Sequence, residues 1–178
     1  ENDIYISSCS TLKDDLTMWR LYGDDAKGVC LVFTLRDEYS KNFDIYKVSY
    51  AKDKNEHEKM KLLKALCDMG FVFTYLKKWK HFFKPIEFEN EKEIRLLFTD
   101  DHLNISLNRN WVKTKNHSII NPIVDFSLTD ELFPLRLDEI ILGPNFPEKE
   151  LNENQLREMV ASLGLGIRVE KSNIKCYR

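Results

Sequence analysis

The sequence predicts an α+β fold built on a mixed, mostly antiparallel sheet. Short strand patterns are spread over the whole chain, a long helical pattern covers residues 55–83, and a helix followed by a strand closes the chain. Strands and helices do not alternate regularly, which argues against a parallel βαβ fold. The length of 178 residues and the hydrophobic content of 43% predict one domain, residues 1–178, with a real core.

The first part of the chain predicts three strands and one short helix. Alternating patterns predict strands at residues 4–6 and 45–50. An almost continuously apolar run at residues 28–33 predicts a central strand that is covered on both faces. Residues 16–22 form a helical pattern, which Asp14 or Asp15 is placed to cap, and a turn follows at residues 23–25.

The helical pattern at residues 55–83 has apolar residues at spacings of three and four, which predicts one buried stripe. Its members are Leu62, Leu66, Met69, Phe73, Leu76, Trp79 and Phe83. Gly70 is expected to kink this helix or to split it, and Pro85 is expected to end it.

The rest of the chain predicts further strands and a terminal helix. Strands are expected at residues 91–98, 103–107, 119–124, 137–142 and 166–170. Asp100 and Asp101 form the predicted turn of a hairpin, and Pro122 restricts its strand to the edge of a sheet. We expect the last helix to begin at Asn152 as its cap and to end at Gly164.

Charge and composition exclude several classes of protein. A net charge of −2 argues against a general nucleic-acid footprint, and no apolar run reaches the length of about 20 residues that spans a membrane. With no signal-peptide pattern, we expect a cytoplasmic protein with no membrane partner. Neither the four cysteines nor the four histidines have zinc spacing, so no metal is expected, and Cys30 and Cys67 are expected to be buried thiols.

A charged face on the predicted strand at residues 91–98 is the strongest functional signal. Side chains alternate on a strand, so Glu91, Glu93 and Arg95 share one face, opposite an apolar face. One interpretation is a carboxylate site, in which one glutamate holds a hydroxyl group and the other stabilises positive charge or acts as a base. The other interpretation is a solvated strand face with a local ion pair.

Two further groups of residues have a functional and a structural interpretation. The hydroxyl groups of Ser8 and Ser10 are placed to bind a ribose or to orient a carboxylate, but serines also cap helices and build turns. Trp19 and Tyr22 are placed to stack on a ligand ring, with Arg20 reaching a phosphate, but both aromatic residues also suit a core.

Two basic stretches each contain a tryptophan. They are residues 77–81, with Lys77, Lys78, Trp79, Lys80 and His81, and residues 109–115, with Arg109, Trp111, Lys113 and Lys115. Both are suited to contact phosphates and stacked bases, but solvated helix and loop faces are the favoured interpretation of both.

Several of these motifs, taken in order, resemble a bacterial family known as domain of unknown function 2971. They are Ser8-Cys9-Ser10, residues 14–19 with Tyr22, Gly28-Val29, Phe88 followed by Glu91, Glu93 and Arg95, and residues 140–143. Members of that family usually carry an upstream segment with an Asn-Asp-Pro pattern. The resemblance therefore implies that an N-terminal segment of the family precedes Glu1.

A second likeness concerns activity. A serine-rich strand followed by Glu-x-Glu on another strand is similar to the ADP-ribosyltransferase superfamily. The likeness implies NAD as substrate, Glu93 as the catalytic glutamate, Glu91 as its companion toward the acceptor, and Ser8 and Ser10 as support. The arginine or histidine that this superfamily carries on an early strand is not found in the chain.

This second likeness implies an ADP-ribosyltransferase-like enzyme or an NAD glycohydrolase, acting as a bacterial toxin or phage-defence effector on a protein or nucleic-acid acceptor. The alternative is a non-catalytic sensor or interaction module that binds such a partner. A metal-dependent nuclease that uses Glu91 and Glu93 ranks last.

Overall fold

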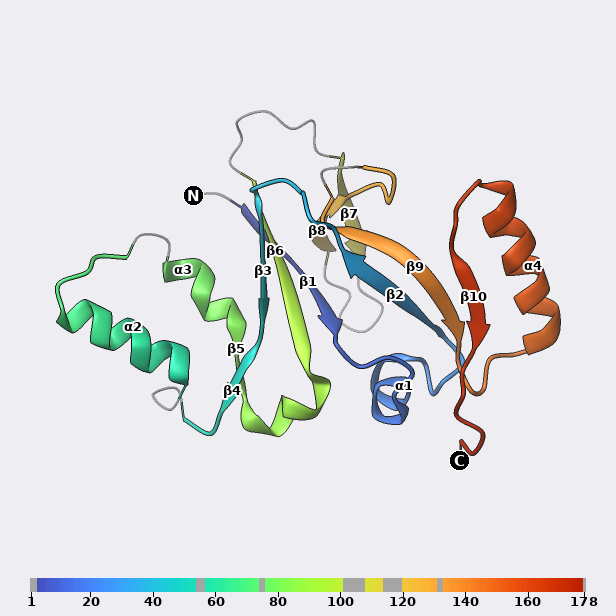
Figure 1. Ribbon diagram of the computed structural model, residues 1–178, viewed down its shortest axis with the longest axis horizontal. Helices are drawn as coiled ribbons and strands as arrows, with labels where there is room; N and C mark the ends of the chain where they lie inside the picture. The colour runs from blue at the N-terminus through green and yellow to red at the C-terminus, as the bar shows by residue number, and fades with distance from the viewer. Residues whose placement is uncertain are drawn as a thin grey trace. The chain divides into compact units, whose positions relative to one another are not determined.

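The computed structural model describes residues 3–53, 57–73, 76–100, 108–113, 120–130 and 133–177 (Figure 1). It divides into two compact units: unit 1 comprises residues 1–11 and 41–126, and unit 2 comprises residues 12–40 and 127–178. Both contain helices and small sheets, and most of the strand pairings in the described residues are antiparallel, so the predicted α+β class is confirmed. The single-domain organisation stays a prediction.

The main sheet of unit 1 has the order β1-β6-β3 and is antiparallel throughout. Its strands are β1 (Asp3–Ser10), β6 (Glu93–Asp100) and β3 (Phe43–Lys47), with β6 in the middle (Figure 1). Leu96, Leu97 and Phe98 are buried, so both faces of this central strand are covered. The ring of Phe98 packs 5.0 Å from the rings of Phe43 and Phe126, which anchors the sheet in its core.

The approach to β6 differs from the predicted strand at residues 91–98. Residues Ile86–Glu91 form a 3₁₀ helix, η3, and Lys92 then adopts the left-handed conformation with φ of 45° before β6 begins at Glu93. A residue in that conformation cannot continue a strand. The prediction that Glu91 lies on the strand is therefore wrong.

A short parallel pair lies beside this turn. It joins β4 (Ser49–Ala51) to β5 (Phe83–Pro85), and η2 (Lys80–Phe82) precedes β5. The predicted strand at residues 45–50 is divided at Val48, whose backbone N–H donates to the carbonyl of Glu93 at 2.9 Å. The chain at Pro85 is a strand end and not the end of a helix.

The predicted long helix is two separate helices, α2 (Glu58–Asp68) and α3 (Leu76–Trp79). Gly70 ends the first part with φ of +89°, a conformation that glycine adopts without strain. The prediction that Gly70 splits the segment is confirmed. Leu63 is buried, whereas Leu62 and Met69 are exposed, so the predicted stripe is wrong at these two positions.

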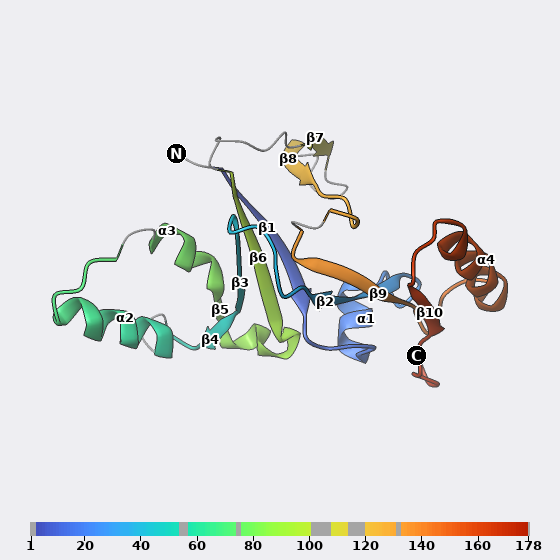
Figure 2. The same cartoon turned by 45° about the horizontal axis from the view of Figure 1, so that its top comes forward.

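Two strands near the end of unit 1 form an antiparallel ribbon. They are β7 (Asn108–Lys113) and β8 (Ile120–Asp125), which lie side by side in Figure 2. β8 pairs with β7 in a two-stranded sheet, so the predicted edge position of this proline-containing strand is confirmed. The predicted strand at residues 103–107 and the turn residue Asp101 lie outside the described residues.

The sheet of unit 2 has the order β10-β9-β2. The central strand β9 (Leu135–Leu142) is antiparallel to β2 (Val29–Leu35) and parallel to β10 (Arg168–Lys171). β9 ends in the buried residues 140–142. β2 is an edge strand with exposed Val29 and Leu31, so the predicted central strand that is covered on both faces is wrong.

The helix α1 (Leu16–Tyr22) begins as one of the two predicted caps requires. The Oδ1 atom of Asp15 accepts hydrogen bonds from the backbone N–H groups of Thr17 and Met18 at 2.9 and 3.0 Å. Asp14 has a different role, because its Oδ1 atom accepts from the Trp19 indole Nε1 at 2.8 Å. Trp19 is buried against Ala26 and Ile141 in the core of unit 2.

We expect Asp15→Ala to lower the free energy of unfolding by about 1 kcal/mol, because two backbone N–H groups lose their acceptor. The change is measured from the midpoint of urea unfolding. Asp15→Asn is the control, since asparagine caps as well as aspartate does. Equal losses in both variants would contradict a role of Asp15 as the cap.

The helix α4 (Lys149–Ser162) begins earlier than predicted, because Glu148 is the cap residue. The predicted cap Asn152 lies inside the first turn, where its Nδ2 atom donates to the Pro147 carbonyl at 2.9 Å. Val160 packs against Ile140 and Val169, while Met159 and Leu163 are exposed. Gly164 follows the C-cap residue, as predicted.

None of the described helices has the length and apolar character that crossing a bilayer requires.

Cys67 is exposed, so its expected burial is wrong, whereas Cys30 is half-buried. Burial raises the pKa of the Cys30 thiol above its ordinary value.

Candidate functional site

The pairing of β1 with β6 places four of the predicted site residues together. Ser8 lies opposite Arg95, and Ser10 lies opposite Glu93. Residues directly opposite in an antiparallel pair point to the same face, and so do residues two apart on one strand. The two serines, Glu93 and Arg95 therefore occupy one face of the unit 1 sheet.

Glu93 is a buried carboxylate with three kinds of partner. Its side chain is 7% exposed, and Arg95 reaches it from Nε to Oε1 at 2.8 Å and from Nη2 to Oε2 at 3.2 Å. Lys84 Nζ lies 3.3 Å from Oε2, and the Ser8 hydroxyl also donates to the carboxylate. Burial alone would favour the neutral acid, but these hydrogen bonds and positive charges outweigh it and lower the pKa of Glu93.

Glu91 joins the same group from the 3₁₀ helix η3. Its side chain is 10% exposed, and its Oε2 atom lies 2.5 Å from Lys84 Nζ. The Ser10 hydroxyl donates to the backbone carbonyl of Glu91 at 2.7 Å, which ties η3 to β1. Glu91 and Glu93 therefore meet around one lysine, although they do not share a strand.

Lys84 comes from β5 and connects the two carboxylates. Burial disfavours its charge, but the hydrogen bonds to Glu91 and Glu93 and their negative charges outweigh burial and raise the pKa of Lys84. Its ammonium group also lies 4.6 Å from the centre of the Phe88 ring. We refer to Lys84, Glu91, Glu93 and Arg95 as the carboxylate cluster.

Backbone groups hold the carboxylate cluster in place. The Glu93 N–H donates to the Tyr50 hydroxyl at 2.9 Å, and Arg95 Nη1 donates to the His81 carbonyl. Burial, followed by the positive charges of Lys80 and Arg95, lowers the pKa of His81. The Arg95 guanidinium is therefore fixed between a carboxylate and a carbonyl, which orients Glu93.

The carboxylate cluster matches neither sequence interpretation completely. It contains two carboxylates and two cations, so the ion pair of the structural interpretation is present, but both glutamates are buried and not solvated. Lys84 and Tyr50 are not among the site residues that the sequence pattern predicts. Charge balance was the available signal for Lys84, since two sequestered carboxylates and one arginine require a second cation.

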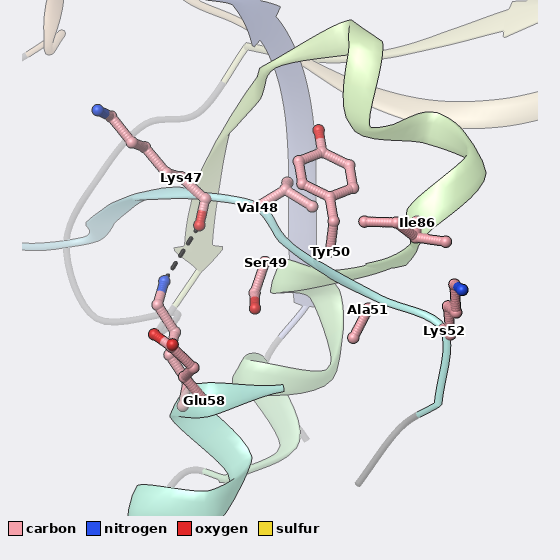
Figure 3. A pocket seen from close by; sticks show the side chains of 9 residues that line it. Lys47, Val48, Ser49, Tyr50, Ala51, Lys52, Glu58 and Ile86 are labelled. Atoms are coloured by element: carbon pink, nitrogen blue, oxygen red, sulfur yellow. Dashed lines mark hydrogen bonds between the residues drawn. The ribbon is translucent and has the colours of Figure 1, made fainter. Parts of the chain in front are cut away.

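Unit 1 contains a cavity of about 590 Å³, whose lining residues are drawn in Figure 3. It is lined by residues 47–52, Glu58, Lys59 and Ile86. Tyr50 connects its wall to Glu93, and Lys59 Nζ donates to the Lys47 carbonyl at 3.1 Å. The Lys47 ammonium group points away from the other lining residues, whereas its carbonyl faces Lys59 (Figure 3).

Trp19, Arg20 and Tyr22 belong to unit 2, whereas the carboxylate cluster belongs to unit 1. The core interpretation holds for Trp19 but not for Tyr22, which is exposed. The Arg20 guanidinium lies 5.6 Å from the centre of the Tyr177 ring. Their role as substrate contacts stays a prediction.

The two basic stretches have different surroundings. In the first, Lys78 pairs with Asp44 at 2.9 Å, and the ring of Trp79 stacks on Tyr46 at 6.2 Å. The side chain of Lys77 is not described. In the second, residues 109–113 lie on β7, and Lys115 lies outside the described residues.

Over the described ranges, histidine, cysteine, aspartate and glutamate side chains do not come together in groups of three or more that could hold a metal ion.

Comparison with known proteins gives one family. No curated protein and no solved structure matches the chain. The model of a family described as protein of unknown function (DUF2971) matches residues 18–96. This range contains Glu91, Glu93 and Arg95. The likeness to the ADP-ribosyltransferase superfamily stays a prediction. Residues 18–96 are therefore similar to the DUF2971 family of proteins of unknown function.

Proposed function

We propose that this protein cleaves NAD, as an ADP-ribosyltransferase-like enzyme or an NAD glycohydrolase. The arrangement of Glu93 supports the proposal, because a serine on the neighbouring strand and an arginine on its own strand hold this buried carboxylate. In this proposal, the protein acts as a bacterial toxin or as a phage-defence effector.

The first step breaks the bond between the nicotinamide nitrogen and C1′ of the ribose. Nicotinamide leaves with the bonding electron pair, and positive charge develops at C1′. An ionised carboxylate fixed nearby stabilises that charge more than it stabilises the bound substrate. The lowered pKa keeps Glu93 ionised at neutral pH, so this residue has the protonation state that the step needs.

The second step adds an oxygen nucleophile to C1′. Water serves in a glycohydrolase, and a hydroxyl group of an acceptor serves in a transferase. The nucleophile must lose a proton, and Glu91, the other carboxylate of the carboxylate cluster, accepts it. Lys84 lies 2.5 Å from Glu91, and Arg95 lies 2.8 Å from Glu93, so each carboxylate has one close cation that fixes its position.

The test is NAD consumption by the full-length protein, with wild type compared with Glu93→Gln. We expect turnover to fall to background in this variant, because the amide is isosteric but carries no charge. Glu87→Gln is the matched control, since Glu87 is an exposed glutamate of η3 and should leave turnover unchanged. Circular dichroism verifies that each variant is folded. Unchanged turnover in folded Glu93→Gln would contradict the proposal.

A second candidate is a non-catalytic module that binds a protein or nucleic-acid partner. The charge balance of the carboxylate cluster favours it, because two carboxylates paired with two cations need no ligand to be stable. Folded wild-type protein that consumes no NAD would support this candidate over the enzyme.

A further inference from the structure

The ribbon of β7 and β8 has one face with an unusual composition. Alternation along β7 places Arg109, Trp111 and Lys113 on the same face. The antiparallel register places a residue of β8 opposite each of them on that face: Val124 opposite Arg109, Pro122 opposite Trp111, and Ile120 opposite Lys113. We refer to these six residues as the ribbon face.

The ribbon face is open to solvent at its centre. Trp111 is 71% exposed, and Ile120 beside it is 64% exposed. Tryptophan contributes a large apolar area that a folded protein normally covers, so an exposed tryptophan next to an exposed isoleucine indicates a surface for a partner. A two-stranded ribbon also gains stability when a partner covers one face.

The charges of the ribbon face have one sign. Arg109 and Lys113 lie two residues before and after Trp111, about 7 Å to each side along the strand. The acidic residue of β8, Asp125, is on the opposite face, where Asn110 donates a hydrogen bond to it. The described residues of the two strands therefore bring two cations and no carboxylate to the ribbon face.

We propose that the ribbon face binds single-stranded nucleic acid. Trp111 stacks on one base, while Arg109 and Lys113 contact the phosphates on either side of that base. A single strand is the matching ligand because its bases expose their faces, whereas a duplex keeps them stacked. This site is independent of NAD cleavage, since it uses no residue of the carboxylate cluster.

The test measures the fluorescence anisotropy of labelled oligothymidylate and oligouridylate with the full-length protein. We expect binding that weakens as salt rises from about 50 mM to about 200 mM. Trp111→Ala should weaken binding about 10-fold, and Trp111→Phe should retain most of it because it keeps a ring. Trp111→Phe also keeps the test valid if the alanine variant does not fold.

The cations are tested separately. Arg109→Gln combined with Lys113→Gln should reduce the slope of log affinity against log salt by about 1.4, or about 0.7 for each lost phosphate contact. Lys61→Gln combined with Lys64→Gln, two exposed lysines of α2, is the control with the same loss of charge and should leave the slope unchanged. Absence of binding at low salt would overturn the proposal, as would equal slopes in both double variants.

Discussion

Gly143→Ala is expected to lower the free energy of unfolding by about 3 kcal/mol, because the site has no room for one more carbon atom. A Cβ at this position would overlap the Ala26 carbonyl oxygen and would lie 2.8 Å from the Ala26 carbonyl carbon. Both atoms are backbone atoms, so no side-chain rotation relieves the overlap. Gly143 N–H also donates to the Gly28 carbonyl at 3.0 Å, which fixes the two segments at this distance. Urea unfolding measures the change.

Gly166→Ala is the control for that experiment. A Cβ at Gly166 would have no neighbouring atom within 4 Å, and its backbone has no positive φ. We expect a change within about 0.5 kcal/mol at this position. If both substitutions had the same small effect, the close approach of Gly143 to Ala26 would not exist in solution.

Local chemistry explains which parts of the fold could be predicted. Asp15 caps α1 and Gly70 ends the first half of the helical segment, because both effects depend on a few neighbouring residues. The edge position of β2 could not be predicted, because a continuous apolar run does not state how many strands flank it. β9 takes the central place in that sheet, and only the long-range pairing determines this order.

In the candidate site, too, local patterns could be predicted and long-range contacts could not. Alternation placed Glu93 and Arg95 on one face, and the structure has a 2.8 Å ion pair between them. Glu91 reaches the same lysine by a different route, through a 3₁₀ helix and a left-handed Lys92 that the sequence pattern does not indicate. Ser8 meets Glu93 through the register of β1 on β6, a contact between residues far apart in the chain.

The charge of Glu93 is expected to contribute to stability as well as to any reaction. Glu93→Gln should lower the free energy of unfolding at neutral pH by about 3 kcal/mol, because it leaves the half-buried Arg95 and Lys84 with one fewer negative charge. The amide keeps one oxygen that accepts a hydrogen bond, so the loss reports the charge together with the hydrogen bonds that the second oxygen accepts. Urea unfolding at neutral pH measures it, with Glu87→Gln as the exposed control.

The pH dependence of that loss identifies its cause. The pKa of Glu93 in the folded protein lies below the ordinary value of 4.5, so its carboxylate stabilises the folded state above pH 4.5. This stabilisation is lost as the pH falls through the folded-state pKa, where wild-type Glu93 becomes neutral like glutamine. The difference in unfolding free energy between wild type and Glu93→Gln should therefore be constant near neutral pH and should close in acid.

Lys84 determines the upper pH limit of the stabilisation that the charges of the carboxylate cluster provide. Its pKa in the folded protein is raised above 10.5, so its stabilising contribution is complete at lower pH and is lost only as the pH rises through that raised value. Between these limits both charges are present, and the carboxylate cluster is electrically balanced.

A difference between wild type and Glu93→Gln that stays constant from neutral pH into acid would show that the lost contacts, and not the carboxylate charge, stabilise this part of unit 1.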